Sequence, residues 1–241
     1  MGFNKKYSIK HSRDILQKFI MKNKITSRIL NENFKRRFPS SQQYWETRYL
    51  RNGNSGNGSY GEIAAYKAGI LNKFVEENNI KTIMEFGCGD GNQLQQFKFP
   101  LYVGLDVSLT AIKKCIQIFE KDTSKSFFIY HYKGFADNSR LFQSQLVLSL
   151  DVIYHLLEDE VYENYMHHLF SSSTKYVIIY AWDVEGKKNL HVRHRKFSEW
   201  IATNKKNWHL VKRIENKAAP TCDFFIYEKD NDEVFYKNAC K

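Results

Sequence analysis

The chain has little of what marks secreted, membrane-spanning or metal-binding proteins. Its four cysteines are scattered and form no CxxC pair, so neither a disulfide framework nor a zinc site is indicated. No apolar run approaches the ~18 residues that a membrane span requires, and residues 1–14 lack the apolar stretch of a secretory signal. We therefore expect a protein of the reducing cytoplasm that holds no metal.

What the chain does contain is enough apolar material for a sizeable core. Of its 241 residues, 42% are hydrophobic and 15% are aromatic, a composition that excludes wholesale disorder. The net charge of +11 is unevenly spread, because residues 1–43 hold eleven Lys and Arg against two acidic residues. The sequence therefore predicts two parts, a basic N-terminal arm over 1–43 and a nearly neutral domain over 44–241.

Apolar residues recur at helical spacing within the arm, which predicts a basic amphipathic helix at about 11–33. Three roles are open for this helix. It packs on the following domain with a solvated basic face, it contacts RNA, or it lies on an anionic membrane surface. The last role would place a cytoplasmic protein peripherally at the inner membrane surface.

From residue 61 onward, apolar strands alternate with amphipathic segments. Strands are expected at 81–86, 101–106, 126–132, 145–151, 175–181, 208–214 and 222–228, and helices at 62–79, 108–120, 158–170 and 196–204. Such alternation is typical of βαβ units and a parallel sheet covered on both faces. The last two strands have no helix between them, which predicts an antiparallel hairpin at one edge.

The segment that carries chemistry is EFGCGDGN (85–92), where the first strand ends. Gly87 and Gly89 permit a tight turn and close approach to a ligand. Asp106 follows Gly87 by nineteen residues, at the end of the second strand, where a carboxylate can bind both ribose hydroxyls of a nucleoside. A dinucleotide fingerprint needs its third glycine where Asn92 stands. Glu85 would repel a pyrophosphate and attract a cationic ligand.

This pattern, with LDVS (105–108) one strand later and SLDVIYHL (149–156) after the fourth strand, resembles the class I S-adenosylmethionine-dependent methyltransferases. The resemblance covers about residues 44–230. It implies a Rossmann-like α/β fold with a seven-stranded, mostly parallel sheet, helices on both faces and a C-terminal antiparallel hairpin. It also implies S-adenosylmethionine as the cofactor and methyl transfer as the activity.

The resemblance further implies roles for individual residues. The methionine part of the cofactor would lie along the glycine turn, the ribose at Asp106 and the adenine near Val107. The residues expected to contact the cofactor are Trp45, Arg48, Tyr60, Glu85, Phe86, Gly87, Cys88, Gly89, Asp106, Val107, Ser108 and Asp151. After the third strand, Tyr130, His131 and Asp137 remain alternative candidates for an adenine contact.

The lead-in segment at 44–61 resembles one that folds over the cofactor in many small-molecule methyltransferases. Its Gly/Asn/Ser-rich stretch at 51–61 predicts a long loop, and long loops of this kind are commonly functional. Trp45, Arg48, Tyr49 and Tyr60 are the candidates for this lid. In the alternative interpretation, Trp45 and Tyr49 form the core face of a helix.

Two residues after the fourth strand are the candidates for catalysis. His155 follows Asp151 by four, so a helical turn would point both the same way. An imidazole can take a proton from an acceptor hydroxyl, although a structural role for His155 is the alternative. A metal site at this pair lacks a third ligand. The residues expected to bind the acceptor are Tyr154, His191, Arg193, His194 and Arg195.

The chain contains no Pro-Cys dipeptide and no NPPY-like motif, which argues against base-modifying enzymes. The resemblance points to bacterial enzymes of surface-glycan and secondary metabolism. The expected acceptor is therefore a hydroxyl of a sugar, a glycan precursor or another small molecule. An RNA methyltransferase guided by the basic arm and a non-catalytic cofactor-binding module are the alternatives.

Overall fold

The structure is a computed structural model and describes residues 38, 40–186, 188–189, 191–216 and 222–230. Apart from Phe38, these residues belong to one unit, which begins at Ser40. The basic helix expected at 11–33 lies outside the described residues, and the division of the chain after residue 43 stays a prediction.

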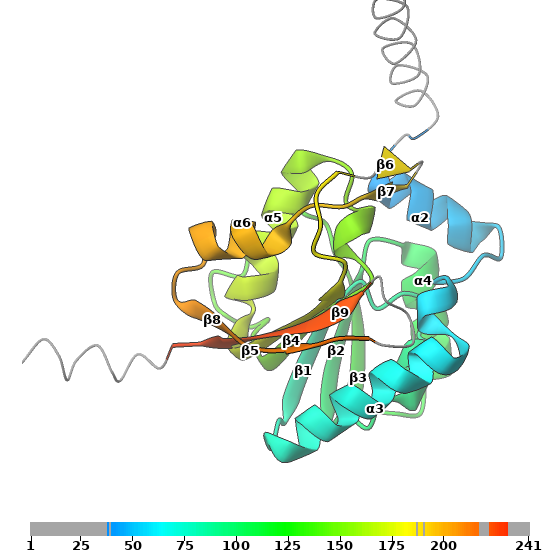
Figure 1. Ribbon diagram of the computed structural model, residues 1–241. Helices are drawn as coiled ribbons and strands as arrows, with labels where there is room; N and C mark the ends of the chain where they lie inside the picture. The colour runs from blue at the N-terminus through cyan, green and yellow to red at the C-terminus, as the bar shows by residue number, and fades with distance from the viewer. Residues whose placement is uncertain (1–37, 39, 187, 190, 217–221, 231–241) are drawn as a thin grey trace, which may run out of the picture. The chain divides into compact units, whose positions relative to one another are not determined.

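Within the described residues, seven strands form one sheet in the order β3-β2-β1-β4-β5-β9-β8 (Figure 1). Strands β1 to β5 run parallel, whereas β9 is antiparallel to both β5 and β8. The strands are β1 (Thr82–Phe86), β2 (Leu101–Asp106), β3 (Lys125–Ile129), β4 (Ser144–Leu150), β5 (Ser173–Ala181), β8 (Trp208–Ile214) and β9 (Asp223–Lys229). The predicted Rossmann-like sheet and its C-terminal hairpin are confirmed.

Helices cover both faces of this sheet. Helices α3 (Gly61–Glu77) and α4 (Leu109–Ile118) pack on one face, and α5 (Asp159–Ser171) and α6 (Phe197–Asn204) pack on the other. Three short 3-10 helices occur at η1 (Asn57–Ser59), η2 (Gln93–Gln96) and η3 (Ile153–His155). A further helix, α2 (Ser41–Leu50), begins after Ser40, whose side chain caps it by accepting from the Gln43 amide.

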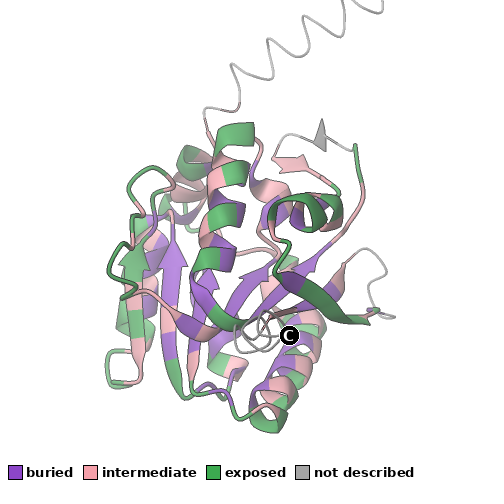
Figure 2. Cartoon of the chain, turned by 90° about the vertical axis from the view of Figure 1, so that its left-hand side faces the viewer, coloured by how far each residue is buried: buried purple, intermediate pink, exposed green. Residues whose placement is uncertain are grey.

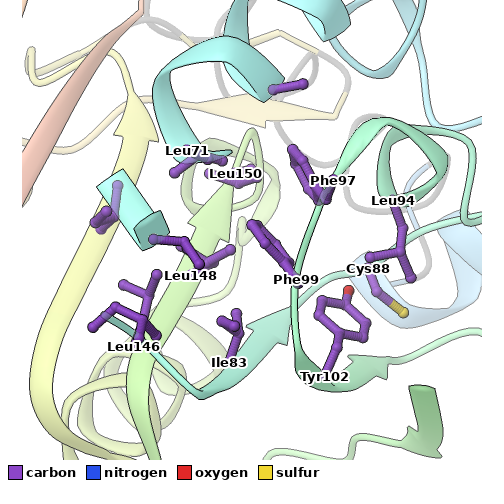
Figure 3. Packing of buried hydrophobic residues seen from close by; sticks show 14 of the residues in the cluster. Leu71, Ile83, Cys88, Leu94, Phe97, Phe99, Tyr102, Leu146, Leu148 and Leu150 are labelled. Atoms are coloured by element: carbon purple, nitrogen blue, oxygen red, sulfur yellow. The ribbon is translucent and has the colours of Figure 1, made fainter. Parts of the chain in front are cut away.

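The central strand β4 shows why the apolar runs are nearly continuous. Leu146, Leu148 and Leu150 face the core under α3, near Leu71 (Figure 3), while the intervening Val147 belongs to the core under α5. Both faces of the strand are thus buried, as parallel sheets require. The other inner strands are also largely buried, whereas the edge strands β3 and β8 and the outer helix surfaces are more exposed (Figure 2).

The structure departs from the expected elements in three places. The third strand ends at Ile129, short of the predicted residue 132, because the Tyr130 ring turns into the core and its hydroxyl lies 2.9 Å from His168 Nδ1. Strands β6 (Lys188–Asn189) and β7 (Val192–Arg193) form a small hairpin that sequence patterns did not indicate. Helix α2 occupies part of the segment interpreted as a lid.

Gly104 in β2 is a test of how tightly this core is packed. A Cβ at this position would lie 2.8 Å from Phe127 Cδ1, 3.0 Å from Cys88 Sγ and 3.0 Å from Tyr102 Cε1. Gly104→Ala is therefore expected to lower the free energy of unfolding by about 1–3 kcal/mol in urea denaturation. Gly69→Ala is the control, because no atom lies within 4 Å of its Cβ position on α3. A Gly104→Ala protein as stable as wild type would refute this packing.

Candidate functional site

The turn that follows β1 depends on glycine. Gly87, Gly89 and Gly91 all have positive φ, at 87°, 61° and 80°, a conformation that other residues rarely adopt. The amides of Gly87 and Cys88 both donate to the Leu105 carbonyl of β2, at 2.7 and 3.0 Å. A Cβ on Gly87 would stand 2.4 Å from Val152 Cγ2. The turn is thus packed directly against the segment that follows β4.

Asp106 ends β2 beside this turn. Its Oδ2 accepts from the Gly89 amide and its Oδ1 accepts from the Ser108 amide, each at 2.9 Å. Burial raises the pKa of Asp106 to about 6, although these two backbone donors lower it. Because each carboxylate oxygen has two lone pairs, Asp106 can still accept two further hydrogen bonds. Val107, the next residue, is half-buried.

Residues 41–60, here called the roof, comprise α2 and the Gly/Asn/Ser-rich loop and lie against the carboxyl edge of the sheet. Helix α2 is attached at two points. Its Glu46 accepts from the Ser108 and Thr110 hydroxyls, at 2.5 and 2.6 Å. Its Ser41 amide donates to Glu158 Oε1 at 2.8 Å. The roof therefore connects the start of α4 with the segment before α5.

The loop of the roof is attached to the glycine turn through Asp90. The Ser55 amide and hydroxyl donate to the two oxygens of Asp90, at 3.0 and 2.8 Å, and the Tyr60 hydroxyl donates to Oδ2 at 2.8 Å. A Cβ on Gly89 would lie 2.3 Å from Ser55 Oγ. The loop thus passes over the turn in close contact, which agrees with the predicted lid.

The helical interpretation of Trp45 and Tyr49 agrees with the structure, whereas their part in a lid over a cofactor stays a prediction. The two residues lie on a helix, and Tyr49 is buried with its hydroxyl 2.9 Å from Ser55 Oγ. Trp45 is only half-buried and contacts the His155 ring edge-on, with centroids 4.9 Å apart. Arg48 donates from Nε to the Asn54 carbonyl at 2.6 Å and lies over the Trp45 ring. The helix is itself part of the roof.

The segment after β4 turns sharply at Asp151, which has φ 61°. Its Oδ2 forms an ion pair with Lys67 Nζ at 2.7 Å, and its Oδ1 accepts from the Tyr154 hydroxyl at 2.7 Å. A Cβ on Gly58 of the roof would lie 2.5 Å from Oδ2. Asp151 thus joins α3, η3 and the roof.

His155 lies in a cluster of half-buried rings beside this turn. Its Nδ1 is 2.8 Å from the His191 carbonyl, which can only accept, so Nδ1 carries the proton and Nε2 holds a lone pair in the neutral ring. Burial lowers the pKa of His155 to about 4. The His191 ring stacks between His155 and Tyr44 at centroid distances of 5.4 and 5.0 Å. At neutral pH His155 is therefore an uncharged acceptor.

The basic cluster after β5 does not stand open for an anionic ligand. Arg193 and Arg195 both pair with Asp159, with N···O distances of 2.5 and 2.9 Å. Arg195 also donates to the Leu156 carbonyl. The His194 ring instead contacts Tyr154 and Trp182, at 5.5 and 5.0 Å between centroids. The two arginines thus secure the segment before α5, whereas His191 and His194 belong to the ring cluster.

Three of the residues expected to line the cofactor turn their side chains into the core. Glu85 is buried and accepts from the Tyr102 hydroxyl at 2.6 Å, and burial raises the pKa of Glu85 to about 7. Phe86 packs in the core under α5. The Cys88 thiol is buried in the opposite core (Figure 3). Only their backbone borders the glycine turn.

The candidates after β3 are dispersed. Tyr130 is buried and contacts His168, while Asp137 accepts from the amides of Leu141 and Phe142 and so holds a local turn. His131 is exposed and stacks on Tyr132. The structure therefore does not bring these three residues together.

Sequence patterns missed Lys67, Glu46 and Asp90. Lys67 stands on the apolar face of α3, three residues after Ala64 and four before Leu71, both of which are buried. A lysine at such a position is a clue to a buried ion pair. Glu46 and Asp90 gave no such clue, because their partners are distant in the sequence.

Within the described ranges, no group of three or more His, Cys, Asp or Glu side chains could hold a metal ion. In the same part of the chain, no helix is both long enough and apolar enough to cross a membrane.

The attachment of the roof through Asp90 is open to a direct test. Asp90→Ala removes the acceptor of three hydrogen bonds from the roof, each of which contributes roughly 0.5–1.5 kcal/mol. Amide hydrogen exchange in residues 51–60 is expected to accelerate about tenfold or more, with α3 unchanged. Asp122→Ala is the control, because the Asp122 side chain bonds to the neighbouring residues Ser124 and Lys125. Unchanged protection of the loop would contradict the attachment.

The chain was compared with known proteins. No protein-family model and no curated protein matches it. Among solved structures, the N-methyltransferase NodS from Bradyrhizobium japonicum WM9, in complex with S-adenosyl-L-homocysteine, is 15% identical with a TM-score of 0.63. That match covers 80% of this chain and 100% of NodS.

Two further structures are similar over most of this chain. Magnesium protoporphyrin IX methyltransferase (ChlM) from Synechocystis PCC 6803 is 12% identical with a TM-score of 0.58, covering 78% of this chain and 98% of that one. The small RNA methyltransferase HEN1 is 15% identical with a TM-score of 0.55, covering 73% of this chain and 27% of that one. The chain has the Rossmann-like fold of the class I S-adenosylmethionine-dependent methyltransferases.

Proposed function

We propose that this chain binds S-adenosylmethionine and transfers its methyl group to a hydroxyl oxygen of a sugar, a glycan precursor or another small molecule. The observation that carries the proposal is the position of Asp106, a buried carboxylate with free lone pairs beside a glycine turn. The shared fold supports it, because the solved structures include NodS and ChlM with bound cofactor or cofactor product. The acceptor rests on the resemblance in sequence.

The order of the strands supports one direction for the bound cofactor. Neighbouring strands lie about 4.8 Å apart, and β1 separates β2 from β4. The end of β4 is therefore roughly 10 Å from Asp106, a distance that the amino-acid part of the cofactor can span. With the ribose at Asp106, the adenine lies toward Val107 and β3, and the amino-acid end lies toward Asp151.

The residues around the glycine turn fit a cofactor of this kind. A Cβ on Gly87 or Gly89 would collide with neighbouring atoms, so glycine keeps a backbone surface open beside the ligand. The Asp106 carboxylate lies beside the turn, whereas Glu85 points into the core and Asp151 pairs with Lys67. A carboxylate at this position suits a cofactor that carries a sulfonium and an ammonium, and it disfavours a pyrophosphate.

The roof would exclude water from the site and hold the amino-acid end of the bound cofactor. Arg48 lies within electrostatic range of His155 and His191, on the side of the site where that end would lie. Its guanidinium is suited to a carboxylate. Trp45 and Tyr60, which also belong to the roof, would enclose the amino-acid end of the cofactor. Ser108 would contribute through the backbone beside Asp106.

The chemistry required of the protein is limited. When bound, S-adenosylmethionine supplies an activated methyl group with a neutral thioether as the leaving group. The protein must align the acceptor oxygen with that methyl and take its proton. His155 fits the second task, because its Nε2 holds a lone pair and Nδ1 is fixed by the His191 carbonyl. Asp151 is engaged by Lys67 and Tyr154, so its part is to shape the turn.

The acceptor would lie against the half-buried rings of Tyr154, His191 and His194. Rings of this kind offer contact area for a sugar. Arg193 and Arg195, also expected to bind the acceptor, both pair with Asp159 and so have less capacity for it. RNA methylation remains the second candidate, favoured by the +9 charge of residues 1–43. A non-catalytic module is disfavoured by the intact turn and Asp106.

The cofactor site is tested by Asp106→Ala in calorimetric titration with S-adenosylhomocysteine. Losing the two ribose hydrogen bonds should weaken binding by roughly 2–4 kcal/mol. In wild type, affinity should also fall as the pH drops below about 6, because protonated Asp106 is a poorer acceptor. Asp122→Ala is the control. Unchanged affinity in Asp106→Ala, or tight binding of NAD by wild type, would refute the proposal.

The catalytic base is tested by His155→Ala on the acceptor found by labelling with radioactive S-adenosylmethionine. Turnover is expected to fall about 10²–10⁴-fold with little change in cofactor affinity. His209→Ala is the control, since His209 is exposed and pairs with Asp230 on the β8 edge. Near-normal turnover in His155→Ala would show that His155 only holds the ring cluster together.

A further inference from the structure

Lys67 is the most deeply buried charged side chain that sequence patterns left without a role. It has no exposed surface, and its ammonium group lies 2.7 Å from Asp151 Oδ2 and 5.2 Å from the centroid of the Tyr180 ring. Its helix packs against the sheet through apolar neighbours such as Ala68 and Leu71. The Lys67 side chain thus extends from the buried face of α3 to the carboxyl end of β4.

Stability alone does not account for such a pair. Removing two charges from water costs several kcal/mol, and apolar side chains of similar volume often replace a buried ion pair without loss. Apart from Asp151, the neighbours of Lys67 include the apolar residues Ala68 and Leu71 and the Tyr180 ring, which would suit a methionine or leucine at residue 67. The position of the pair, at the strand end that borders the proposed cofactor site, points to function instead.

The conformation of Asp151 shows what the pair controls. Positive φ is uncommon for a residue with a side chain, and Asp151 is held there by three partners. Its amide donates to the Tyr180 carbonyl at 2.9 Å, Lys67 engages Oδ2 and Tyr154 engages Oδ1. The turn places Val152 against Gly87 and the carboxylate against Gly58 of the roof. These contacts enclose the end of the site on the β4 side.

We propose that Lys67 is a positioning residue, which fixes the Asp151 turn so that it receives the amino-acid end of the cofactor. This inference rests on the proposed function, because it needs the cofactor to lie with its ribose at Asp106. Asp151 keeps lone pairs beyond the two that Lys67 and Tyr154 use, and these suit an ammonium group. Lys67 itself touches neither the cofactor nor the acceptor.

The experiment compares two ligands that differ at that end. S-adenosylhomocysteine carries the amino-acid group, whereas 5′-methylthioadenosine has the same nucleoside and thioether but no amino-acid group. The dissociation constants of both are measured by calorimetric titration for wild type, Lys67→Met and Lys67→Arg. Lys73→Met is the matched control, because Lys73 lies on the same helix with a side chain 72% exposed.

The ratio of the two dissociation constants is the readout. Lys67→Met is expected to weaken the binding of S-adenosylhomocysteine about tenfold or more, because the Asp151 turn would no longer be held in contact with the ammonium group and one charge-assisted contact is worth roughly that factor. The binding of methylthioadenosine should not change. Lys67→Arg should keep part of the preference for S-adenosylhomocysteine over methylthioadenosine, and Lys73→Met should keep all of that preference. A folded Lys67→Met protein with the wild-type ratio would overturn the inference, as would equal weakening of both ligands.

A second variant covers the case in which Lys67→Met does not fold because Asp151 is left unpaired. The double variant Lys67→Met/Asp151→Asn removes both charges together. It should bind methylthioadenosine like wild type and lack the preference for S-adenosylhomocysteine, whereas a retained preference would overturn the inference. If the wild-type protein binds neither ligand, the proposed function itself fails. That outcome is distinct from one in which wild type binds both ligands and the variants overturn the role of Lys67.

Discussion

The left-handed glycine turn after β1 is the constraint on which the site depends. Three glycines with positive φ stand within five residues, and each faces a different segment. Gly87 faces Val152 after β4 and Gly89 faces Ser55 of the roof. A Cβ on Gly91 would lie 3.1 Å from Cys115 Sγ of α4. A side chain at any of these positions would push one of those segments away. The turn therefore sets how closely the sheet edge, α4 and the roof approach one another.

Burial of acidic groups is the second feature that organises the site. Asp106 and Glu85 lie in the interior, and burial raises the pKa of each, to about 6 and about 7. Asp90 and Asp151 are instead committed to partners that hold the roof and the β4 turn. Asp90 thus fastens one wall of the site, whereas Asp106 and Asp151 keep lone pairs for a ligand.

Much of the fold could be predicted from the sequence because its causes are local. The apolar runs of β1 and β4, the glycine turn and the Ser108 cap of α4 each follow from a few neighbouring residues. The contacts that could not be predicted are those between residues far apart in the sequence. Arg193 and Arg195 form a local basic cluster, yet Asp159 lies more than 30 residues away. The same holds for Glu46 of α2, which bonds to Ser108 and Thr110 at the start of α4, and for the carbonyl that orients His155.

The roof shows how one segment can follow two local patterns at once. Helical spacing placed Trp45 and Tyr49 on one face, and the loop composition indicated a lid. In the structure α2 is a helix that polar contacts attach to the start of α4, and closure over a cofactor stays a prediction. The position of α2 and its loop is fixed by the hydrogen bonds that Ser41, Glu46 and Ser55 form with residues distant in the sequence, and no local pattern predicts these bonds.

The central claim is that this edge of the sheet binds S-adenosylmethionine with its ribose at Asp106. A crystal structure of the chain grown with S-adenosylhomocysteine tests it most directly. The account predicts both ribose hydroxyls within hydrogen-bond distance of Asp106, the adenine beside Val107 and the amino-acid end at the Asp151 turn. A ligand bound elsewhere, or no bound ligand at saturating concentration, would contradict it.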